Sequence, residues 1–217
     1  MLDAETFKKF TRQANLSHQQ FCVWFAFNNE YAKHQDRWNK FYPESYFAPE
    51  DFDKTKGCKY KNFWGVTLAS TQHGWILGIA RLFDPAFHPF DKKQEKPRIS
   101  FDYILRRLND QNLSDKLRQE LDWHKNVIES VRKHRDNVLA HNDASFDYKK
   151  IGPGIENLFE WLEDVISRIK KTEPHLSSCG VVNVKYHEKL SQCGVDEVFE
   201  TLLLGEKHEV DESRRTS

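Results

Sequence analysis

The sequence has no excess of charge of either sign. Its 33 lysines and arginines balance 33 aspartates and glutamates, so the formal net charge at pH 7 is +0. Any contact with nucleic acid must therefore rest on a local basic patch and not on the overall field. No apolar stretch approaches the roughly 20 residues of a membrane span, and the first residues lack the basic-then-apolar pattern of a signal peptide. We expect a cytoplasmic protein that does not bind membranes.

Cysteine is scarce, and its spacing excludes a strong zinc motif. The chain has four cysteines, two of them in the C-terminal segment. There His175, Cys179, His187 and Cys193 offer side chains that bind zinc, but the short Cys-x2-Cys pair of a recognisable zinc site is missing. Thiols in cytosolic proteins are normally reduced. We expect ordinary thiols, no metal and no cofactor, with a zinc hydrolase as the alternative.

Aromatic residues, by contrast, are abundant. They make up 13% of the chain, with six Trp and sixteen Phe, whereas disordered chains are poor in them. Apolar residues recur at helical spacing almost throughout. The sequence predicts an all-α fold, an up-and-down helical bundle of four to five main helices with long loops. We expect residues 1–172 to form the bundle and residues 173–217 a small C-terminal extension with a short helix and a disordered tail.

Capping residues and apolar faces predict the N-terminal helices. A first helix covers residues 4–14, and a second begins at Ser17, where the run Ser-His-Gln-Gln is typical of a capping box. A central helix over residues 61–83 is apolar on more than one side and cannot continue past Pro85. The aromatic-rich connection over residues 38–60 is expected to pack over the bundle, although long loops often carry function or stack bases.

The second half of the chain continues the helical pattern. Ser100 is expected to cap a short helix, and Ser114 to start a long one. A helix over residues 155–169 shows a regular apolar face at spacings of three and four. In the extension, residues 181–186 are typical of a short strand and residues 195–204 of a last short helix.

Polar residues interrupt the buried face of the long helix that begins at Ser114. The same stripe that carries its apolar residues continues through His124, Arg135 and Asn142. A guanidinium in a core-facing position is costly unless it is paired or lines a site. A break of this kind in an otherwise consistent helix is where function is expected. The apolar members of the stripe are Leu117, Leu121, Ile128, Val131 and Val138.

Arg135 and His141 together have the chemistry to cleave RNA without a metal. The imidazole can move the proton of the 2′-hydroxyl or of the leaving oxygen, and the guanidinium can stabilise the charge on the phosphate. This reaction needs the 2′-hydroxyl, so it acts on RNA and not on DNA. Six residues turn an α-helix by about 240°, which separates the two side chains. Either the helix ends near Ala140, or two chains share the site.

Neighbouring polar residues are candidates for supporting roles. His134 shares a helix face with His141 and gives a competing pair. Asp136 could orient an arginine or a histidine of a second chain. Asn142 supports the site or simply ends the helix. Basic candidates for an RNA-binding patch, which could equally be a solvated helix face, are Arg106, Arg107, Arg132 and Lys133.

A purely structural role is the alternative for each member of the motif. Arg135 could pair with Asp84, or with Asp136 of a second chain, and hold helices in register. His141 could be a helix C-terminal histidine favoured by the dipole. Arg81 and Asp84 are expected to form a local pair, or else to line the site.

The run Arg-Asp-x-x-x-Ala-His-Asn-Asp over residues 135–143 resembles the Arg-x(4–6)-His signature of the HEPN superfamily. It is most similar to the branch named after the U-type phage abortive-infection proteins. The preceding long helix and the run Arg-Leu-Phe-Asp at residues 81–84, which ends an earlier apolar helix, support the resemblance. The resemblance covers about residues 15 to 170.

The resemblance implies an all-α domain that dimerises with its two motifs facing each other. Many members are metal-independent endoribonucleases of toxin–antitoxin, abortive-infection or CRISPR-linked phage defence. Arg135 and His141 match the catalytic pair, and Asp136 matches the polar residue that follows the arginine. The main hypothesis is thus a homodimeric RNA-cleaving enzyme, a toxin or phage-defence component, with an antitoxin or nucleotidyltransferase-like protein as partner. The alternative is a non-catalytic helical module that dimerises and binds a protein or a nucleotide.

Overall fold

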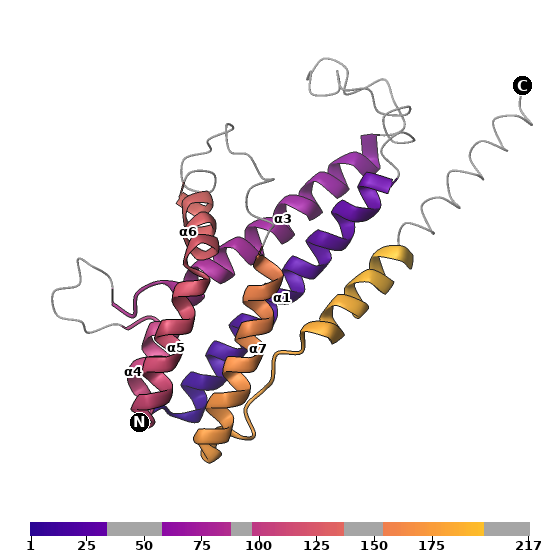
Figure 1. Ribbon diagram of the computed structural model, residues 1–217. Coiled ribbons are helices and arrows are strands. Elements are labelled where there is room, and N and C mark those ends of the chain that lie inside the picture. The colour runs from indigo at the N-terminus through magenta and orange to yellow at the C-terminus, as the bar shows by residue number, and fades with distance from the viewer. Residues whose placement is uncertain (34–57, 88–96, 137–153, 198–217) are drawn as a thin grey trace, which may run out of the picture. The chain divides into compact units, whose positions relative to one another are not determined.

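Every regular element in the described part of the chain is helical (Figure 1). The computed structural model describes residues 1–33, 58–87, 97–136 and 154–197. The predicted all-α helical bundle is confirmed. No helix of the described residues is long and apolar enough to cross a membrane. Several predictions lie outside these ranges, and they concern most of the aromatic connection, His141, Asn142, Val138 and the charged tail.

The helices follow one another with short connections wherever the chain is described. Helix α5 begins after Leu108, Asn109 and Asp110, and a single residue, His124, separates it from α6. A further helix covers residues 184–197. The elements are α1 (Ala4–Lys33), α3 (Cys58–Phe83), α4 (Phe101–Arg107), α5 (Gln111–Trp123), α6 (Lys125–His134), α7 (Ile155–Thr172) and the 3-10 turn η5 (Pro174–Leu176).

The described residues belong to two compact units. Unit 1 comprises residues 1–20 and 73–185, and unit 2 comprises residues 21–72 and 186–217. Unit 1 therefore contains the candidate site residues that the structure describes. In unit 2 the buried side chains of Ala26, Phe27 and Val195 pack together. The domain boundary at residue 172 that the sequence predicts differs from this division and stays a prediction.

The predicted break between two N-terminal helices is absent. Helix α1 runs without interruption for 30 residues, and its first turn is capped by Asp3, whose carboxylate accepts from the Thr6 amide at 2.8 Å. Ser17 is buried inside the helix, and its hydroxyl donates to the Gln13 carbonyl at 2.8 Å. A serine that bonds one turn back needs no helix end. The capping box expected at Ser17 was therefore wrong.

Two glycines let α3 come close to α1 within unit 1. A Cβ placed on Gly78 would lie 2.9 Å from the Ser17 Cβ and would overlap its hydroxyl oxygen. The three atoms nearest to a Cβ on Gly74 all belong to the end of the Gln20 side chain, with 2.6 Å to Oε1. The serine is held by its backbone bond and cannot withdraw, whereas the long glutamine can. Small size is therefore required at Gly78 more than at Gly74.

Replacing each glycine by alanine is expected to affect stability differently at the two positions. Gly78→Ala should destabilise the protein by roughly 1–3 kcal/mol, because the added methyl group overpacks the helix contact. Gly74→Ala should be neutral or stabilising, since alanine favours a helix by about 1 kcal/mol over glycine. Urea unfolding of both variants measures the difference. Equal destabilisation by the two would contradict the assigned contact.

Helix α7 supplies the largest apolar face of unit 1. Seven of its side chains, at the predicted spacings of three and four, are buried. Phe159 packs against the ring of His18 in α1, with 4.5 Å between centroids. The seven residues are Ile155, Leu158, Phe159, Leu162, Val165, Ile166 and Ile169. This prediction is confirmed residue by residue, because a regular apolar face has only one way to be buried.

The long helix expected from Ser114 onward is two helices. Helix α5 begins earlier, where the Asp110 carboxylate accepts from the Leu113 amide at 2.9 Å. It ends at His124, whose backbone leaves the helical conformation and whose amide bonds back to the Leu121 carbonyl. Ser114 lies inside α5, and its hydroxyl donates to the Leu105 carbonyl of α4 at 3.0 Å. The apolar stripe survives the break, because Leu117, Ile128 and Val131 are all buried.

A nearly buried carboxylate joins α5 to α7. Glu120 accepts hydrogen bonds from the Trp161 indole at 3.0 Å and from Arg168 Nη1 at 2.8 Å. Its side chain is 10% exposed. The hydrogen bonds from Arg168, opposed by burial and assisted by Trp161, lower the pKa of Glu120 to about 2. Arg168 also pairs with Asp164 at 2.8 Å.

Glu120 makes the stability of the fold depend on acid. Because its folded-state pKa is depressed from 4.5 to about 2, its contribution is complete above pH 4.5 and is lost as the pH falls toward 2. The loss should be about 2 kcal/mol after allowance for solvent. The free energy of unfolding of Glu120→Gln, measured by urea titration from pH 6 to pH 2, should fall less steeply. A parallel slope in the two proteins would refute the assignment.

The segment after α7 is joined to the start of the chain. The Glu173 carboxylate accepts from the Asn109 amide and side chain, both at 2.8 Å. His175 Nε2 lies 2.8 Å from the Leu2 carbonyl, and Asn15 donates to the Val181 carbonyl at 2.8 Å.

The strand predicted over residues 181–186 is wrong, since residues 184–197 are helical. Val182 and Val184 are buried there, whereas Val181 is 59% exposed.

Candidate functional site

Three arginines surround one carboxylate where α3 ends. Asp84 follows α3 directly, and Pro85 prevents that helix from continuing. The Asp84 side chain, 13% exposed, accepts from Arg135 Nη1 at 3.0 and 3.1 Å. Arg98 Nη1 lies 3.4 Å away, and Arg132 Nε lies 3.8 Å away. We call Asp84, Arg98, Arg132, Arg135 and Asp136 the arginine cluster.

Arg135 is held on two sides. Its Nε donates to Asp136 at 2.8 Å while its Nη1 is bound by Asp84. Its side chain is 25% exposed, and its Nη2 forms no hydrogen bond with another described residue. The hydrogen bond to Asp136, opposed by partial burial and assisted by Asp84, raises the pKa of Arg135 above its usual range. Arg135 is therefore a permanent and oriented cation.

Arg132 anchors the cluster to the backbone. Its Nη2 donates to the carbonyl of Phe83, the last residue of α3. Arg132 and Arg135 are one turn apart, so both reach toward Asp84 from the end of α6. The backbone continues over residues 135 and 136 as a π-helical turn, a wide turn that is frequent at functional sites. The predicted polar break in the stripe is thus also a change in helix geometry.

The cluster keeps a positive charge after its internal pairing. The guanidinium groups of Arg98, Arg132 and Arg135 carry three positive charges, against two negative charges on Asp84 and Asp136. One net positive charge therefore remains in a partly buried place. Phosphate is the natural ligand of such a set, because a planar guanidinium matches two phosphate oxygens.

The structure separates some predicted site residues from this cluster. His134 is fully buried in the core. Arg81 is exposed, and the pair expected between Arg81 and Asp84 is not formed among the described residues, since Asp84 is taken by the three arginines. Asp84 therefore pairs with Arg135, and its role in a site stays a prediction. His141 and Asn142 lie outside the described residues.

Two members of the cluster were missed or misjudged from the sequence. Arg98 stands near the end of a proline- and lysine-rich connection, where nothing in the sequence distinguishes it from a solvated charge. Arg132 was considered only for a surface patch, although its spacing of three from Arg135 places both on one face. Of the other patch candidates, Arg106 pairs with Asp102 at 3.0 Å and Arg107 lies 5.2 Å from the ring of Tyr103.

A small cavity opens beside the cluster. It measures about 190 Å³ and lies between the end of α3 and the helices α5 and α6. Arg132 belongs to both the cavity wall and the cluster, and Phe83 precedes Asp84 in the chain. Its lining residues are Phe83, Leu121, Asp122, Lys125, Ile128, Glu129 and Arg132.

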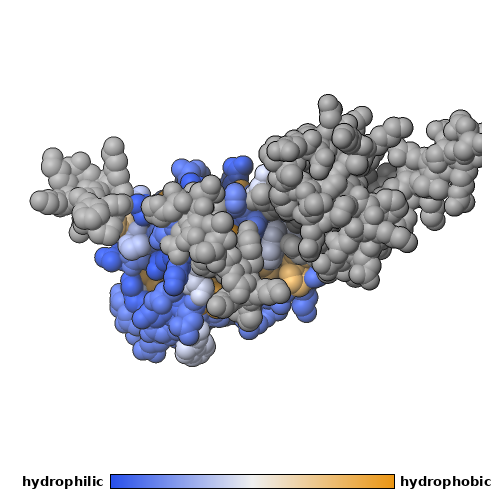
Figure 2. Space-filling view, turned by 90° about the horizontal axis from the view of Figure 1, so that it is seen from above, coloured by the Kyte–Doolittle hydropathy of each residue, from blue (hydrophilic) through white to orange (hydrophobic). Residues whose placement is uncertain are grey.

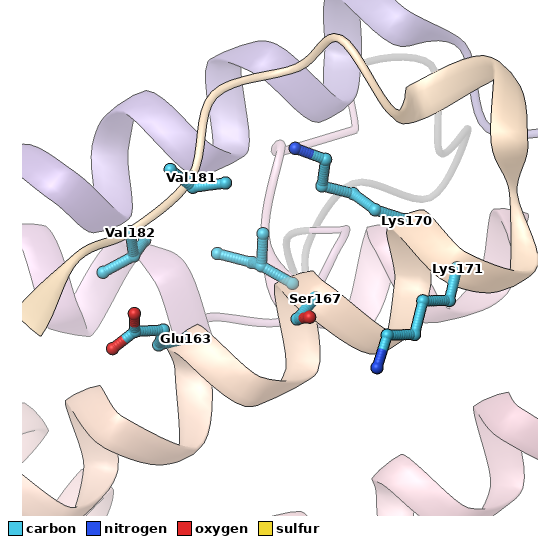
Figure 3. Close-up of a pocket in the computed structure, with 7 residues that line it drawn as sticks. Glu163, Ser167, Lys170, Lys171, Val181 and Val182 are labelled. Atoms are coloured by element: carbon cyan, nitrogen blue, oxygen red, sulfur yellow. The ribbon is translucent and has the colours of Figure 1, made fainter.

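A larger cavity of about 380 Å³ lies between α7 and the segment that follows it (Figure 3). Its polar groups do not converge. Lys170 donates to the Cys179 carbonyl at 2.6 Å, and Figure 3 shows the amino groups of Lys170 and Lys171 pointing in different directions. Glu163 accepts from the Val184 amide at 3.3 Å. This cavity therefore has the features of a gap between packed elements and not of a ligand-binding site.

The face of the protein seen in Figure 2 is polar over most of its described part. In the view of Figure 2 its residues are mainly hydrophilic, and hydrophobic ones show only in small areas. No group of three or more His, Cys, Asp or Glu that could hold a metal is present among the described residues. Cys179, one of the residues considered for zinc, instead directs its thiol to the Ala4 carbonyl at 3.6 Å.

Comparison with known proteins gave no match: no family model, no curated protein and no solved structure is similar to the chain.

The buried His134 predicts a second dependence of stability on pH. Burial, assisted by the charge of His73, lowers the pKa of His134 to about 4. The neutral imidazole therefore suits the fold, so stability is complete above pH 6.5 and decreases as the pH falls from 6.5 toward 4. The decrease should be about 2–3 kcal/mol. The free energy of unfolding of His134→Leu, measured by urea titration, should not decrease over this pH range. A decrease equal to that of the wild-type protein would contradict the role of His134.

Proposed function

We propose that the protein is a metal-independent endoribonuclease of HEPN type. The observation that carries the proposal is the arginine cluster: Arg135 is oriented by Asp84 and Asp136, and the cluster retains a positive charge. This oriented cation stands six residues before His141, the histidine of the motif. A preorganised cation of this kind stabilises charge that develops on a phosphate.

The reaction assigns a separate task to each group. The 2′-hydroxyl oxygen attacks the adjacent phosphorus, the bond to the 5′-oxygen of the next nucleotide breaks, and a 2′,3′-cyclic phosphate forms. Arg135 stabilises the negative charge on the non-bridging oxygens. The 2′-hydroxyl loses its proton and the leaving 5′-oxygen gains one; His141 performs one of these two transfers and water the other. Asp84 and Asp136 position the guanidinium without touching the substrate.

We place the active site at the interface of a homodimer. A regular α-helix would separate residues six apart by about 240°, whereas two chains packed along α6 would bring Arg135 of one near His141 of the other. The resemblance to the HEPN superfamily supports this arrangement. It also supports a cytoplasmic role as a toxin or phage-defence component, with an antitoxin or nucleotidyltransferase-like protein as partner.

One observation favours the second candidate function, a non-catalytic helical module. Asp84 binds the Arg135 guanidinium through both carboxylate oxygens, which is also what a purely structural ion pair would do. In that case the cluster joins α3 to α6 and the protein dimerises and binds a partner or a nucleotide. The two functions differ in whether RNA is cleaved.

Cleavage of RNA by the purified protein in EDTA tests the proposal. Incubation with tRNA and mRNA should yield fragments that end in 2′,3′-cyclic phosphate. Arg135→Ala and His141→Ala should each lower the rate by about 10² to 10⁴, because each removes transition-state stabilisation or proton transfer. Intact RNA with the wild-type protein, or fragments that persist unchanged in His141→Ala, would overturn the proposal.

Arg168→Ala is the matched control. Arg168 is an arginine of similar exposure, 22% against 25%, and is likewise held by two carboxylates. It lies outside the arginine cluster, so its loss should reduce stability but not the cleavage rate of the folded protein. Circular dichroism identifies the temperature at which all variants remain folded. An equal loss of cleavage in Arg168→Ala and Arg135→Ala would point to a structural role for both.

A further inference from the structure

The cavity beside the arginine cluster, of about 190 Å³, has the volume for a single ring system. It is smaller than the roughly 300–1,000 Å³ that drug-sized ligands occupy. Three of its lining residues are apolar: Phe83, Leu121 and Ile128. Phe83 and Ile128 are 6% and 4% exposed, so they form fixed parts of the wall.

The wall is rigid because it belongs to the aromatic core of unit 1. The Phe83 ring stacks on Trp161 with 6.4 Å between centroids and lies 5.9 Å from the ring of Phe101. Trp161 in turn contacts His124 at the α5–α6 junction, at 4.9 Å. A cavity with packed apolar walls is preformed, which lowers the entropic cost of binding a ligand.

Polar groups line the same cavity from α5 and α6. Lys125 and Glu129 form an ion pair at 4.0 Å across one helical turn. Asp122 is exposed and makes no ion pair with another described residue. Asp122 therefore offers a carboxylate to a ligand, while Lys125 and Glu129 largely neutralise each other.

Arg132 connects the cavity to the cluster. It lines the cavity, and its Nε lies 3.8 Å from the Asp84 carboxylate that holds Arg135. A ligand that places a ring in the cavity can thus place an anionic group at the cluster next to it. A ring joined to a phosphate through a short spacer is the chemistry of a nucleotide.

We infer that this cavity holds the nucleobase next to the phosphate bound at the arginine cluster, and that it selects guanine. The inference rests on the proposed function and names the substrate feature that its site would recognise. Proteins that read RNA sequence bind unstacked bases by their edges and by stacking. Guanine carries two adjacent donors, the N1–H and the N2 amino group, and a free carboxylate accepts both at once. Uracil offers one donor flanked by two carbonyl oxygens, which a carboxylate repels.

Binding of mononucleotides tests the inference without any need for cleavage. Titration of the full-length protein with guanosine and uridine monophosphates, each as the 5′ and the 3′ form, is followed by calorimetry. At least one guanosine monophosphate should bind about 10-fold more tightly than its uridine counterpart. Asp122→Asn should remove most of this difference, because the amide presents a donor where guanine needs an acceptor. Equal affinity for both bases would overturn the inference.

Glu163→Gln is the control variant, since Glu163 lines the other cavity and should leave the preference intact. Asp122 is exposed, so its substitution should not prevent folding, which thermal unfolding confirms. A guanine preference that Asp122→Asn leaves unchanged would place the base elsewhere and overturn the assignment of this cavity.

The outcomes separate the inference from the proposed function. Selective binding of guanosine monophosphate without cleavage of RNA would support the guanine site in the cavity and would overturn the proposed endoribonuclease activity. Cleavage of RNA at sites without a guanine, by wild type and Asp122→Asn alike, would support the endoribonuclease activity and would overturn the assignment of the cavity as a guanine site.

Discussion

The arrangement of the candidate site depends on the single carboxylate of Asp84. It lies at the end of α3, is mostly buried, and faces three guanidinium groups that come from α6 and from the connection before α4. A buried carboxylate would be costly alone, and so would three neighbouring arginines. The carboxylate and the arginines compensate for each other. The positive charge that remains on the arginine cluster is available to bind an anion. The fixed position of Arg135 follows from this balance.

The sequence predicted the elements whose signals are periodic. The face of α7 was right at each of its seven apolar positions, and the stripe of Leu117, Ile128 and Val131 is buried as expected. Helix ends were harder, because Ser17 and Ser114 have the side chains of caps but bond to carbonyls inside or between helices. A hydroxyl has several backbone partners within reach, and only the tertiary structure decides among them.

The candidate site was predictable only in part, for a related reason. A guanidinium in an apolar stripe can be recognised in a sequence. The pairing of Arg135 with Asp84 was one of several pairings that the sequence allowed. Arg98 could not be found, since its role arises from a contact 14 residues away across a connection without periodicity. The break at His124 and the π-helical turn after His134 are likewise features of backbone geometry that no spacing in the sequence indicates.

Two of the three boundaries between the units fall after residues 20 and 72, which are inside α1 and α3. Neither helix can be cut there without creating new ends whose backbone groups lack partners. The units are therefore not modules that recombination could exchange or that a protease could release intact. In this protein, a gene rearrangement that preserves the arginine cluster must carry both long helices whole.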